Sequence, residues 1–251
     1  MSTTIALITG GGRGIGRACA LRLAHNGTRV IVTGRTAGEI DAVAAETGGL
    51  AIRADMADRD QVDQLLERVR SEVGRVDILI NNAGIAESAS LARVTDQSWD
   101  RIMEINATAP FRLCRALIPA MVESGWGRVI NIASNAGVSG YAYTAAYCAS
   151  KHALVGLTRS LAVDLATTGV TVNAVCPGWV DTRMVEQATQ RIAEKTGRTV
   201  DQARGALAGM SPQKRILTPD EVAHVVSALA GEMGRGINGQ AIVIDGGQVL
   251  K

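Results

Sequence analysis

The sequence predicts an α/β fold, with a doubly wound parallel sheet between two layers of helices. Short apolar runs rich in β-branched residues alternate with longer helical segments along the whole chain of 251 residues, and this repeated order indicates parallel strands. The first run leads directly into a glycine-rich turn and a helix. No linker, repeat or low-complexity tract interrupts the pattern, so we expect one domain over residues 1–251.

In the first half of the chain, each strand is a short run of isoleucine, valine and threonine, which favour extended backbone. These strands are expected at residues 4–9, 29–33, 51–54 and 76–80. The segments between them are longer, and the third has apolar residues at 62, 65, 66, 69 and 73, the spacing of one helical face. Helices are therefore expected at residues 17–24, 37–46 and 59–73.

In the second half, a long helix is expected over 99–122, with Pro110 and Pro119 as kinks or boundaries because proline removes a backbone donor. Strands are expected at 128–132, 170–175 and 240–244, with a helix over 144–166. The region 184–231 reads as helical, with a break near Ser211-Pro212.

The glycine turn has the spacing Gly-x-x-x-Gly-x-Gly, formed by Gly10, Gly14 and Gly16. Glycines allow a tight turn and a close approach to a pyrophosphate, and the following helix points free N–H groups at the anion. No Lys-Ser/Thr pair follows, as a nucleoside-triphosphate loop requires. The turn therefore favours a dinucleotide site, and a plain glycine turn is the alternative.

Tyr147 and Lys151 are four residues apart within the predicted helix 144–166, so both side chains emerge on one face. A tyrosine hydroxyl titrates near ~10 and needs a nearby positive charge to act as an acid–base group at neutral pH. Taken alone, the pair is weak evidence, and a solvated helix face explains it more simply. Ser134, thirteen residues before Tyr147, and the glycine turn favour the chemical interpretation.

Composition excludes several classes of protein. The net charge is +2 and the basic residues are dispersed, which argues against nucleic-acid binding. No apolar run approaches the ~20 residues of a membrane span. The four cysteines and three histidines lack metal-type spacing. The first strand leaves no room for a signal peptide, so we expect a cytoplasmic protein without a metal.

Together these motifs resemble the short-chain dehydrogenase/reductase family, in particular its 3-oxoacyl reductases. The residues that carry the resemblance are Thr9-Gly10, Gly14-Ile15-Gly16, Asp55, Asn81-Asn82-Ala83-Gly84, Asn106, Ser134, Tyr147, Lys151 and Pro177-Gly178. The resemblance implies a Rossmann-type domain that transfers hydride between a nicotinamide and a ketone or secondary alcohol.

It also implies roles for four residues. Tyr147 would protonate the carbonyl oxygen during reduction, and Lys151 would lower the pKa of Tyr147 and hold the nicotinamide ribose. Ser134 would orient the substrate oxygen through a hydrogen bond. Asn106 would hold a water in a proton relay to Lys151.

The end of the second predicted strand favours NADP(H). An NAD enzyme usually has a carboxylate there for the ribose hydroxyls, whereas this chain has Gly34 and Arg35. Arg35 suits a phosphate, and Arg13 could supply a second cation, although both could be solvated and NAD(H) stays possible. By resemblance, the other expected cofactor contacts are Gly10, Gly12, Gly14, Ile15, Gly16, Asp55, Met56, Asn82, Ala83, Gly84, Tyr147, Lys151, Pro177, Gly178, Val180 and Thr182.

Aromatic and apolar residues near Tyr147 suggest a substrate wall, with core packing the alternative for Tyr143 and Trp179. The expected contacts are Ser134, Val138, Tyr141, Tyr143, Trp179 and Met184. Residues 183–215 include three glycines and suit a mobile helical lid. The turns 123–126 and 166–169 contain no cation to dock a carrier protein, which favours a coenzyme A thioester. Cations that could hold a phosphorylated handle are Arg183, Lys195, Arg198, Lys214 and Arg215.

The leading hypothesis is an NADP(H)-dependent reductase of 3-oxoacyl thioesters. The alternative is an NAD-dependent alcohol or hydroxy-acid dehydrogenase, or a polyketide-type ketone reductase. A nucleotide-sensing protein without catalysis is disfavoured because Tyr147 and Lys151 are both present. The helices 99–122 and 144–166 and the last strand match surfaces on which the family forms tetramers, so we expect a homotetramer, with a dimer as the alternative.

Overall fold

The computed structural model describes residues 3–250, and within them seven parallel strands form one sheet in the order β3-β2-β1-β4-β5-β6-β7. The strands are β1 (Ile5–Thr9), β2 (Arg29–Gly34), β3 (Leu50–Arg53), β4 (Ile78–Asn81), β5 (Gly127–Ile132), β6 (Val170–Pro177) and β7 (Ala241–Ile244). The predicted doubly wound α/β fold is confirmed. Residues 1–2 and 251 of the predicted domain lie outside the described range.

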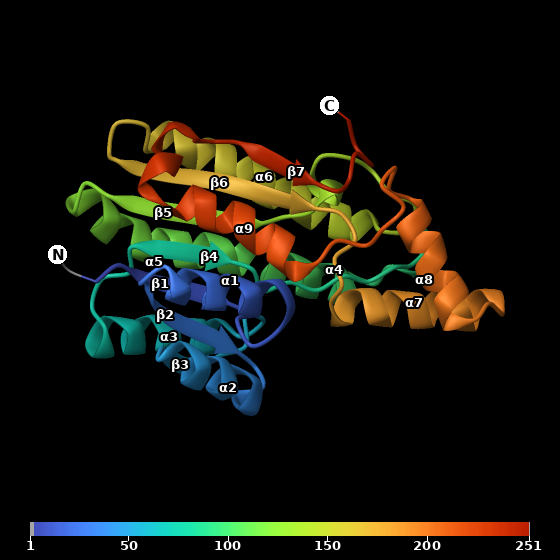
Figure 1. Ribbon diagram of the computed structural model, residues 1–251, viewed down its shortest axis with the longest axis horizontal. Helices are drawn as coiled ribbons and strands as arrows, with labels where there is room; N and C mark the ends of the chain where they lie inside the picture. Colours follow the sequence, from blue (N-terminus) through green and yellow to red (C-terminus); the bar gives the residue numbers. More distant parts are fainter. Residues whose placement is uncertain (1–2, 251) are drawn as a thin grey trace.

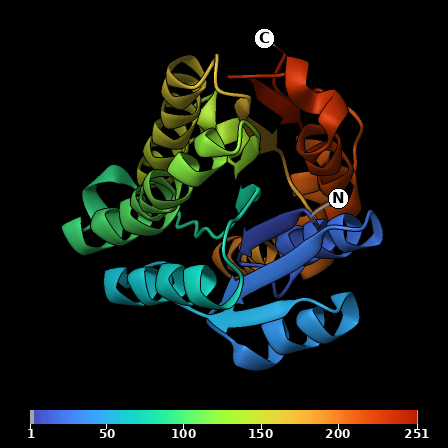
Figure 2. The ribbon, with the colours of Figure 1, turned by 90° about the vertical axis from the view of Figure 1, so that its left-hand side faces the viewer.

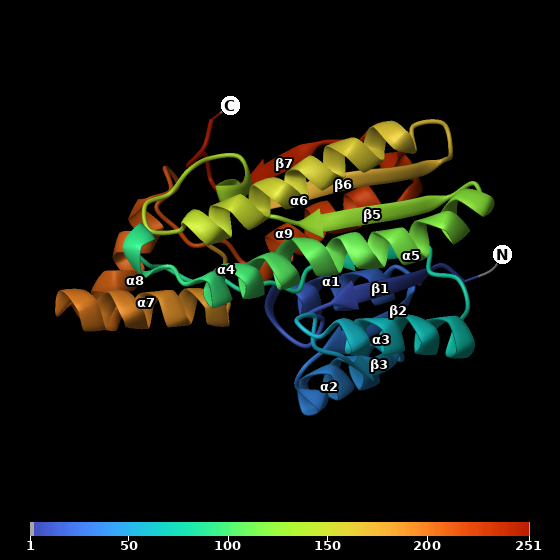
Figure 3. The same ribbon diagram turned by 180° about the vertical axis from the view of Figure 1, so that it is seen from behind.

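Helices cover both faces of this sheet (Figures 1 and 2). One layer consists of α1 (Gly14–His25), α2 (Ala37–Thr47) and α9 (Pro219–Ala230). The other consists of α3 (Arg59–Glu72), α5 (Ala109–Glu123) and α6 (Ala145–Asp164), with α4 (Asp96–Met103) beside it, as Figure 3 shows. The short turns are η1 (Leu91–Arg93), η2 (Glu104–Thr108), η3 (Asn135–Gly137) and η4 (Glu232–Gly236).

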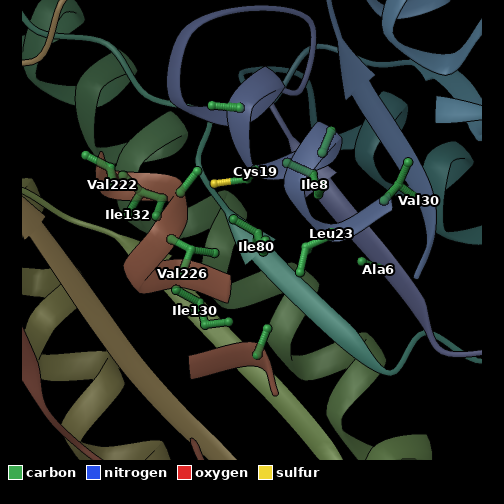
Figure 4. Packing of buried hydrophobic residues seen from close by; sticks show 14 of the residues in the cluster. Ala6, Ile8, Cys19, Leu23, Val30, Ile80, Ile130, Ile132, Val222 and Val226 are labelled. Carbon is green, nitrogen blue, oxygen red and sulfur yellow. The ribbon is translucent and has the colours of Figure 1, made fainter. Parts of the chain in front are cut away.

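The alternation of side chains along each strand explains the two layers. Ala6 and Ile8 of β1 pack into one apolar cluster with α1 and α9, whereas Leu7 packs into another with α3 and α5. Figure 4 shows part of the first cluster. Successive residues of a strand point to opposite faces, and both faces are covered here. Central strands of this sheet are therefore mostly apolar, although β5 also buries Arg128 and Asn131.

The region predicted as one helix over 99–122 consists of α4 and α5 joined by the wider π-helical turn η2. Pro110 lies in the first turn of α5, which agrees with a boundary there. Pro119 lies inside α5 and the helix continues to Glu123, so Pro119 is not a boundary.

The region 184–231 contains more breaks than predicted. It consists of α7 (Arg183–Thr196), α8 (Val200–Gly209) and α9, and the predicted break near Ser211 separates α8 from α9. Gly197 ends α7 in the left-handed conformation, with φ 68°. Gly205 lies inside α8. Figure 1 shows α7 and α8 as a helical pair that projects beyond the sheet.

No helix within residues 3–250 has the length and apolar character needed to cross a bilayer. No group of three or more histidine, cysteine or acidic residues is placed to hold a metal ion in that range.

Candidate active site

All strands of a parallel sheet end at one edge, and the side chains that follow them meet there. This edge faces α7 and α8 (Figure 1). The glycine turn follows β1, Asn82 follows β4, Ser134 follows β5, and Gly178 follows β6. The predicted site residues therefore come to one side of the molecule from different strands.

The glycine turn is tightly packed. Gly10 and Gly14 have φ of 63° and 52°, which only glycine adopts readily. A Cβ on Gly16 would collide with the carbonyl oxygen of Gly10. The turn is thus a close-fitting backbone cradle before α1, and it fits the approach of a pyrophosphate.

Asn82 and Thr9 fix this cradle to the end of β4. The Asn82 Nδ2 donates to the carbonyl oxygens of Thr9 (2.8 Å) and Gly10 (3.1 Å). The Thr9 hydroxyl accepts from the backbone N–H groups of Asn82 and Ala83, both at 2.9 Å. Asn82 therefore supports the turn, in addition to its predicted place beside the adenosine.

The cations near the end of β2 differ in their partners. Arg13 donates to both carboxylate oxygens of Glu39 at 2.9 Å, so its charge is matched within the protein. Arg35 is exposed, and Arg53, opposite Gly34 in β3, donates from Nε to the Arg35 carbonyl oxygen at 3.0 Å. Neither Arg35 nor Arg53 takes part in an ion pair within residues 3–250.

Asp55 and Met56 follow β3 at the same edge. The carboxylate of Asp55 accepts from the backbone N–H of Ala57 at 3.0 Å, and its own N–H donates to Gln61. Met56 is buried in the core. Asp55 is half-buried and can meet an adenine, whereas the Met56 side chain is turned away from solvent.

Tyr147 lies in the first turn of α6 and faces Ser134. Burial raises the pKa of Tyr147 above its usual value of 10.0, and the hydrogen bond with the Ser134 side chain opposes this. At neutral pH the phenol is therefore protonated, as an acid for ketone reduction requires. The Ser134 hydroxyl is buried and also accepts from the backbone N–H of Ala136 at 3.1 Å.

Lys151 is nearly inaccessible, with 4% of its surface exposed. Its ammonium donates to the Ile132 carbonyl oxygen at 2.8 Å and lies 5.8 Å from the centre of the Tyr147 ring. Burial lowers the pKa of Lys151 from 10.5 to about 8. The Lys151 ammonium is therefore held by the end of β5, on the side of the Tyr147 ring.

Asn106 is fully buried in the π-helical turn η2. Its Oδ1 accepts from Ile85 N–H and its Nδ2 donates to Ile85 carbonyl oxygen, both at 2.9 Å. Nδ2 also donates to the Ser150 hydroxyl at 3.0 Å. A Cβ on Gly84 would lie 3.3 Å from Asn106 Oδ1 and 3.4 Å from Lys151 Nζ, so the two groups share this corner of the site.

The segment after β6 lies against the glycine turn. Gly178 N–H donates to Ile244 carbonyl oxygen at 2.9 Å, which continues the pairing of β6 with β7 beyond Pro177. Val180 is buried and forms an isolated parallel bridge to Leu217. Thr182 Cγ2 would lie 3.0 Å from a Cβ on Gly14. The N-cap of α7 is therefore packed on the glycine turn.

The predicted substrate contacts come from the segments that follow β5 and β6. Val138, Tyr141, Trp179 and Met184 are half-buried. Burial and the charge of Asp245 raise the pKa of Tyr141. The side chain of Tyr143 is 67% exposed, and its φ of 63° is unusual for a bulky residue. Core packing is thus excluded for Tyr143.

The turns that suggested a coenzyme A substrate lie at the wrong edge. Residues 123–126 precede β5 and residues 166–169 precede β6. A Cβ on Gly169 would collide with the Gly125 carbonyl oxygen, so the two turns pack together at the amino ends of the strands. Their lack of cations says nothing about the mouth of the site, and that argument against a carrier protein was wrong.

A glycine cradle and a group of Ser134, Tyr147 and Lys151, at the carboxyl edge of a doubly wound sheet, define an oxidoreductase that uses a nicotinamide nucleotide. Residues 4–193 match the model of the short chain dehydrogenase family. The chain belongs to this family.

Relatives of known name cover almost the whole chain. It is 39% identical to a D-beta-hydroxybutyrate dehydrogenase of Cupriavidus necator, with 98% of each chain covered. It is 37% identical to a 3-oxoacyl-[acyl-carrier-protein] reductase of Escherichia coli, with 98% and 97% covered. Among solved structures, an actinorhodin polyketide ketoreductase with NADPH superposes with a TM-score of 0.94 at 34% identity, with 98% and 97% covered.

Sequence reasoning missed two groups at this site. Arg53 was placed in a predicted strand, but its nearness to Arg35 depends on the pairing of β2 with β3. Asn135 and Asp245 lie 110 residues apart, yet the Asn135 Nδ2 donates to Asp245 Oδ2 at 3.2 Å. Asp245 directly follows the last predicted strand, and this position could have indicated it from the sequence. Nothing in the sequence indicates that Asn135 is its partner.

Proposed function

We propose that this protein is an NADP(H)-dependent reductase that converts a 3-oxoacyl thioester into the 3-hydroxyacyl form. The observation that carries the proposal is the protonated Tyr147 beside Ser134. At the adenosine end of the site, Arg35 and Arg53 form no ion pair with any of residues 3–250. The 3-oxoacyl reductase and NADPH-bound ketoreductase relatives support the same direction.

In this proposal Tyr147 donates its phenolic proton to the substrate oxygen, and Ser134 holds that oxygen in place. NADPH, when bound, supplies the hydride. Lys151 has three donor hydrogens, of which Ile132 takes one, so the others can hold the ribose hydroxyls. Asn106 keeps η2 in position beside Lys151, where a water of a proton relay would lie.

The preference for NADP(H) rests on Arg35 and Arg53. Their strands are adjacent, and a phosphate on the adenosine ribose would meet two guanidinium groups there. The carboxylate of Glu39, the acidic residue nearest the glycine turn, is already engaged by Arg13. NAD(H) is the alternative that the assay below compares.

The substrate proposal rests on the charge of the expected wall. A hydroxy acid such as β-hydroxybutyrate carries a carboxylate two carbons from the reacting carbon, and a cation in the substrate wall would strengthen its binding. The predicted contacts Val138, Tyr141, Tyr143, Trp179 and Met184 supply none. A neutral thioester carbonyl fits this set better. Coenzyme A and an acyl carrier protein present the same phosphopantetheine thioester, and the assay separates them.

The test is the initial rate with acetoacetyl-CoA, acetoacetyl carrier protein and β-hydroxybutyrate, each with the NADP and NAD forms. We expect NADPH oxidation with at least one thioester, with NADH at least about tenfold slower. Tyr147→Phe is the control for background oxidation. Turnover of β-hydroxybutyrate alone would favour the hydroxy-acid dehydrogenase, and faster reaction with NADH would contradict the cofactor proposal.

We also propose a cytoplasmic homotetramer, with a dimer as the alternative. β7 is the last strand of the sheet, and its side chains are only partly buried. An apolar edge strand with unpaired backbone groups favours association. Sedimentation at several protein concentrations tests the assembly.

A further inference from the structure

Behind Ser134, a buried carboxylate holds the C-terminal segment. Asp245 follows β7 and is only 5% exposed. Its Oδ1 accepts from the backbone N–H groups of Gly247 and Gln248 at 3.0 Å, and its Oδ2 accepts from Val249 N–H at 2.9 Å. A Cβ on Gly178 would lie 2.7 Å from the Asp245 Cβ, so the carboxylate also packs behind the turn after β6.

Asn135 connects this carboxylate to Ser134. The Asn135 Nδ2 donates to Asp245 Oδ2 at 3.2 Å and to Gln248 Oε1 at 3.3 Å. Its Oδ1 accepts from the Ser134 hydroxyl at 3.4 Å. Asn135 is itself only 6% exposed, so water does not compete freely for these bonds.

The carboxylate of Asp245 determines which group donates in each bond from Asp245 through Asn135 to Ser134. An ionised carboxylate only accepts, so the amide nitrogen of Asn135 must face Asp245. The amide oxygen then faces Ser134, and Ser134 is the donor to it. The Ala136 N–H occupies one lone pair of the Ser134 oxygen at 3.1 Å. The other lone pair is left for the phenolic proton of Tyr147.

We propose that Asp245, acting through Asn135, is a positioning residue that orients the hydroxyl of Ser134, so that the C-terminal segment after β7 controls the catalytic group. The separation of 3.4 Å is long for an O–H···O bond, so Ser134 is aimed by Asn135 yet can release its proton to a substrate oxygen. The expected effect on kcat rests on the proposed ketone reduction. The expected effect on the pKa of Tyr147 does not, because it needs no substrate.

The kinetic test is a double-mutant cycle. Asn135→Leu keeps the approximate shape of the side chain and removes its bonds to Ser134, Asp245 and Gln248. We expect kcat for the accepted ketone to fall about tenfold. The dissociation constant for NADPH and the thermal midpoint stay near those of the native protein. Combined with Ser134→Ala, Asn135→Leu costs nothing further, because its target is gone. An equal loss in both backgrounds would overturn the proposal.

Asp245→Asn is the second variant. The substitution replaces one accepting oxygen of the side chain by a donating nitrogen. The Asn135 Nδ2 then faces a second donor, so the Asn135 amide turns over and presents its nitrogen to Ser134. We expect a loss in kcat that again vanishes in the Ser134→Ala background. Gln248→Met is the matched control, because it removes the other acceptor of Asn135 Nδ2 and leaves Asp245 in place. An equal loss in this control contradicts a specific role for Asp245.

A readout without substrate separates this inference from the proposed function. The absorbance of the phenolate, taken as the difference from Tyr147→Phe, gives the pKa of Tyr147 in the absence of a ketone. In Asn135→Leu and Asp245→Asn the Ser134 proton is free for Tyr147, so that pKa falls. If native protein reduces no ketone, the proposed function fails; if the pKa of Tyr147 is the same in all variants, the positioning role fails.

Discussion

The ammonium of Lys151 donates to the carbonyl oxygen of Ile132 at 2.8 Å. Only 4% of the surface of Lys151 is exposed to solvent. One hydrogen bond to a neutral carbonyl does not offset the loss of water around the charge. Burial accordingly lowers the pKa of Lys151 to about 8 from 10.5. Folding therefore carries a pH-dependent cost at this residue.

The first prediction concerns stability against pH. Above pH 8 folded Lys151 gives up its proton while the unfolded chain keeps it up to about 10.5, so the unfolded state binds more protons and stability rises with pH. Below pH 8 both states are protonated and the cost is constant. Relative to Lys151→Met, native protein should gain about 2 kcal/mol in the free energy of unfolding between pH 7 and pH 9.5.

Urea unfolding of both proteins at the two pH values measures this gain. Tyr147 does not interfere below pH 10, because burial raises its pKa. Parallel curves for the two proteins would show that Lys151 keeps its ordinary pKa. Lys151→Met leaves the Ile132 carbonyl without its donor, but that loss is the same at every pH.

The second prediction concerns the acid. Tyr147→Phe removes only the hydroxyl, so the site keeps its packing and loses its proton donor. We expect turnover to fall by at least about a hundredfold and the dissociation constant of NADPH to change little. Steady-state rates and fluorescence titration measure the two effects. Residual turnover near the native rate would transfer the acid role to another group.

Much of the fold could be predicted because the sheet is buried on both faces. A run such as 5–9 is apolar at positions that serve opposite clusters, so both its length and its composition identify a strand. The prediction of one long helix over 99–122 was less accurate, because the structure divides this region into α4, η2 and α5. Its π-helical turn is held by the amide bonds of Asn106 to Ile85, and no pattern within the segment predicts such a tertiary contact.

At the site, residue spacing predicted that Tyr147 and Lys151 lie on one face of a helix, because helix geometry fixes the relative positions of residues four apart. The partners of each charge could not be predicted. Arg13 and Glu39 come from different βα units, and the Lys151 ammonium is held by a strand carbonyl. These contacts depend on how elements pack, which residue spacing does not encode.

The third prediction concerns cofactor choice. Arg35→Asp puts a carboxylate where a ribose phosphate would lie, and Arg53→Ala removes the neighbouring guanidinium. We expect each to weaken NADPH binding about tenfold or more and to leave NADH binding nearly unchanged. Arg17→Ala is the control, because Arg17 is paired with Glu46 on the surface. An unchanged ratio of NADPH to NADH dissociation constants in both variants would place the phosphate elsewhere.

The fourth prediction concerns the ion pair between Arg13 and Glu39. Glu39→Gln keeps the length of the side chain and frees the Arg13 guanidinium from its carboxylate. We expect the freed Arg13 to reach the same phosphate, so that NADPH binding tightens. The gain should disappear at high salt, because Arg13 and Glu39 are exposed. Titration at two salt concentrations measures it. Weaker binding in Glu39→Gln would show that the ion pair instead shapes the cradle.

The last prediction compares two glycines. Gly16→Ala would place a methyl group against the Gly10 carbonyl oxygen and the Asn82 amide nitrogen. Neither can adjust easily, because Asn82 is hydrogen-bonded to the carbonyl oxygens of Thr9 and Gly10. We expect nucleotide binding to be lost and the thermal midpoint to fall. Gly156 lies inside α6, and a Cβ at this position would meet nothing within 4 Å, so Gly156→Ala should raise the free energy of unfolding by about 0.5–1 kcal/mol and leave binding intact. Normal nucleotide affinity in Gly16→Ala would mean that the turn relaxes without cost, and that the cradle is not the pyrophosphate site.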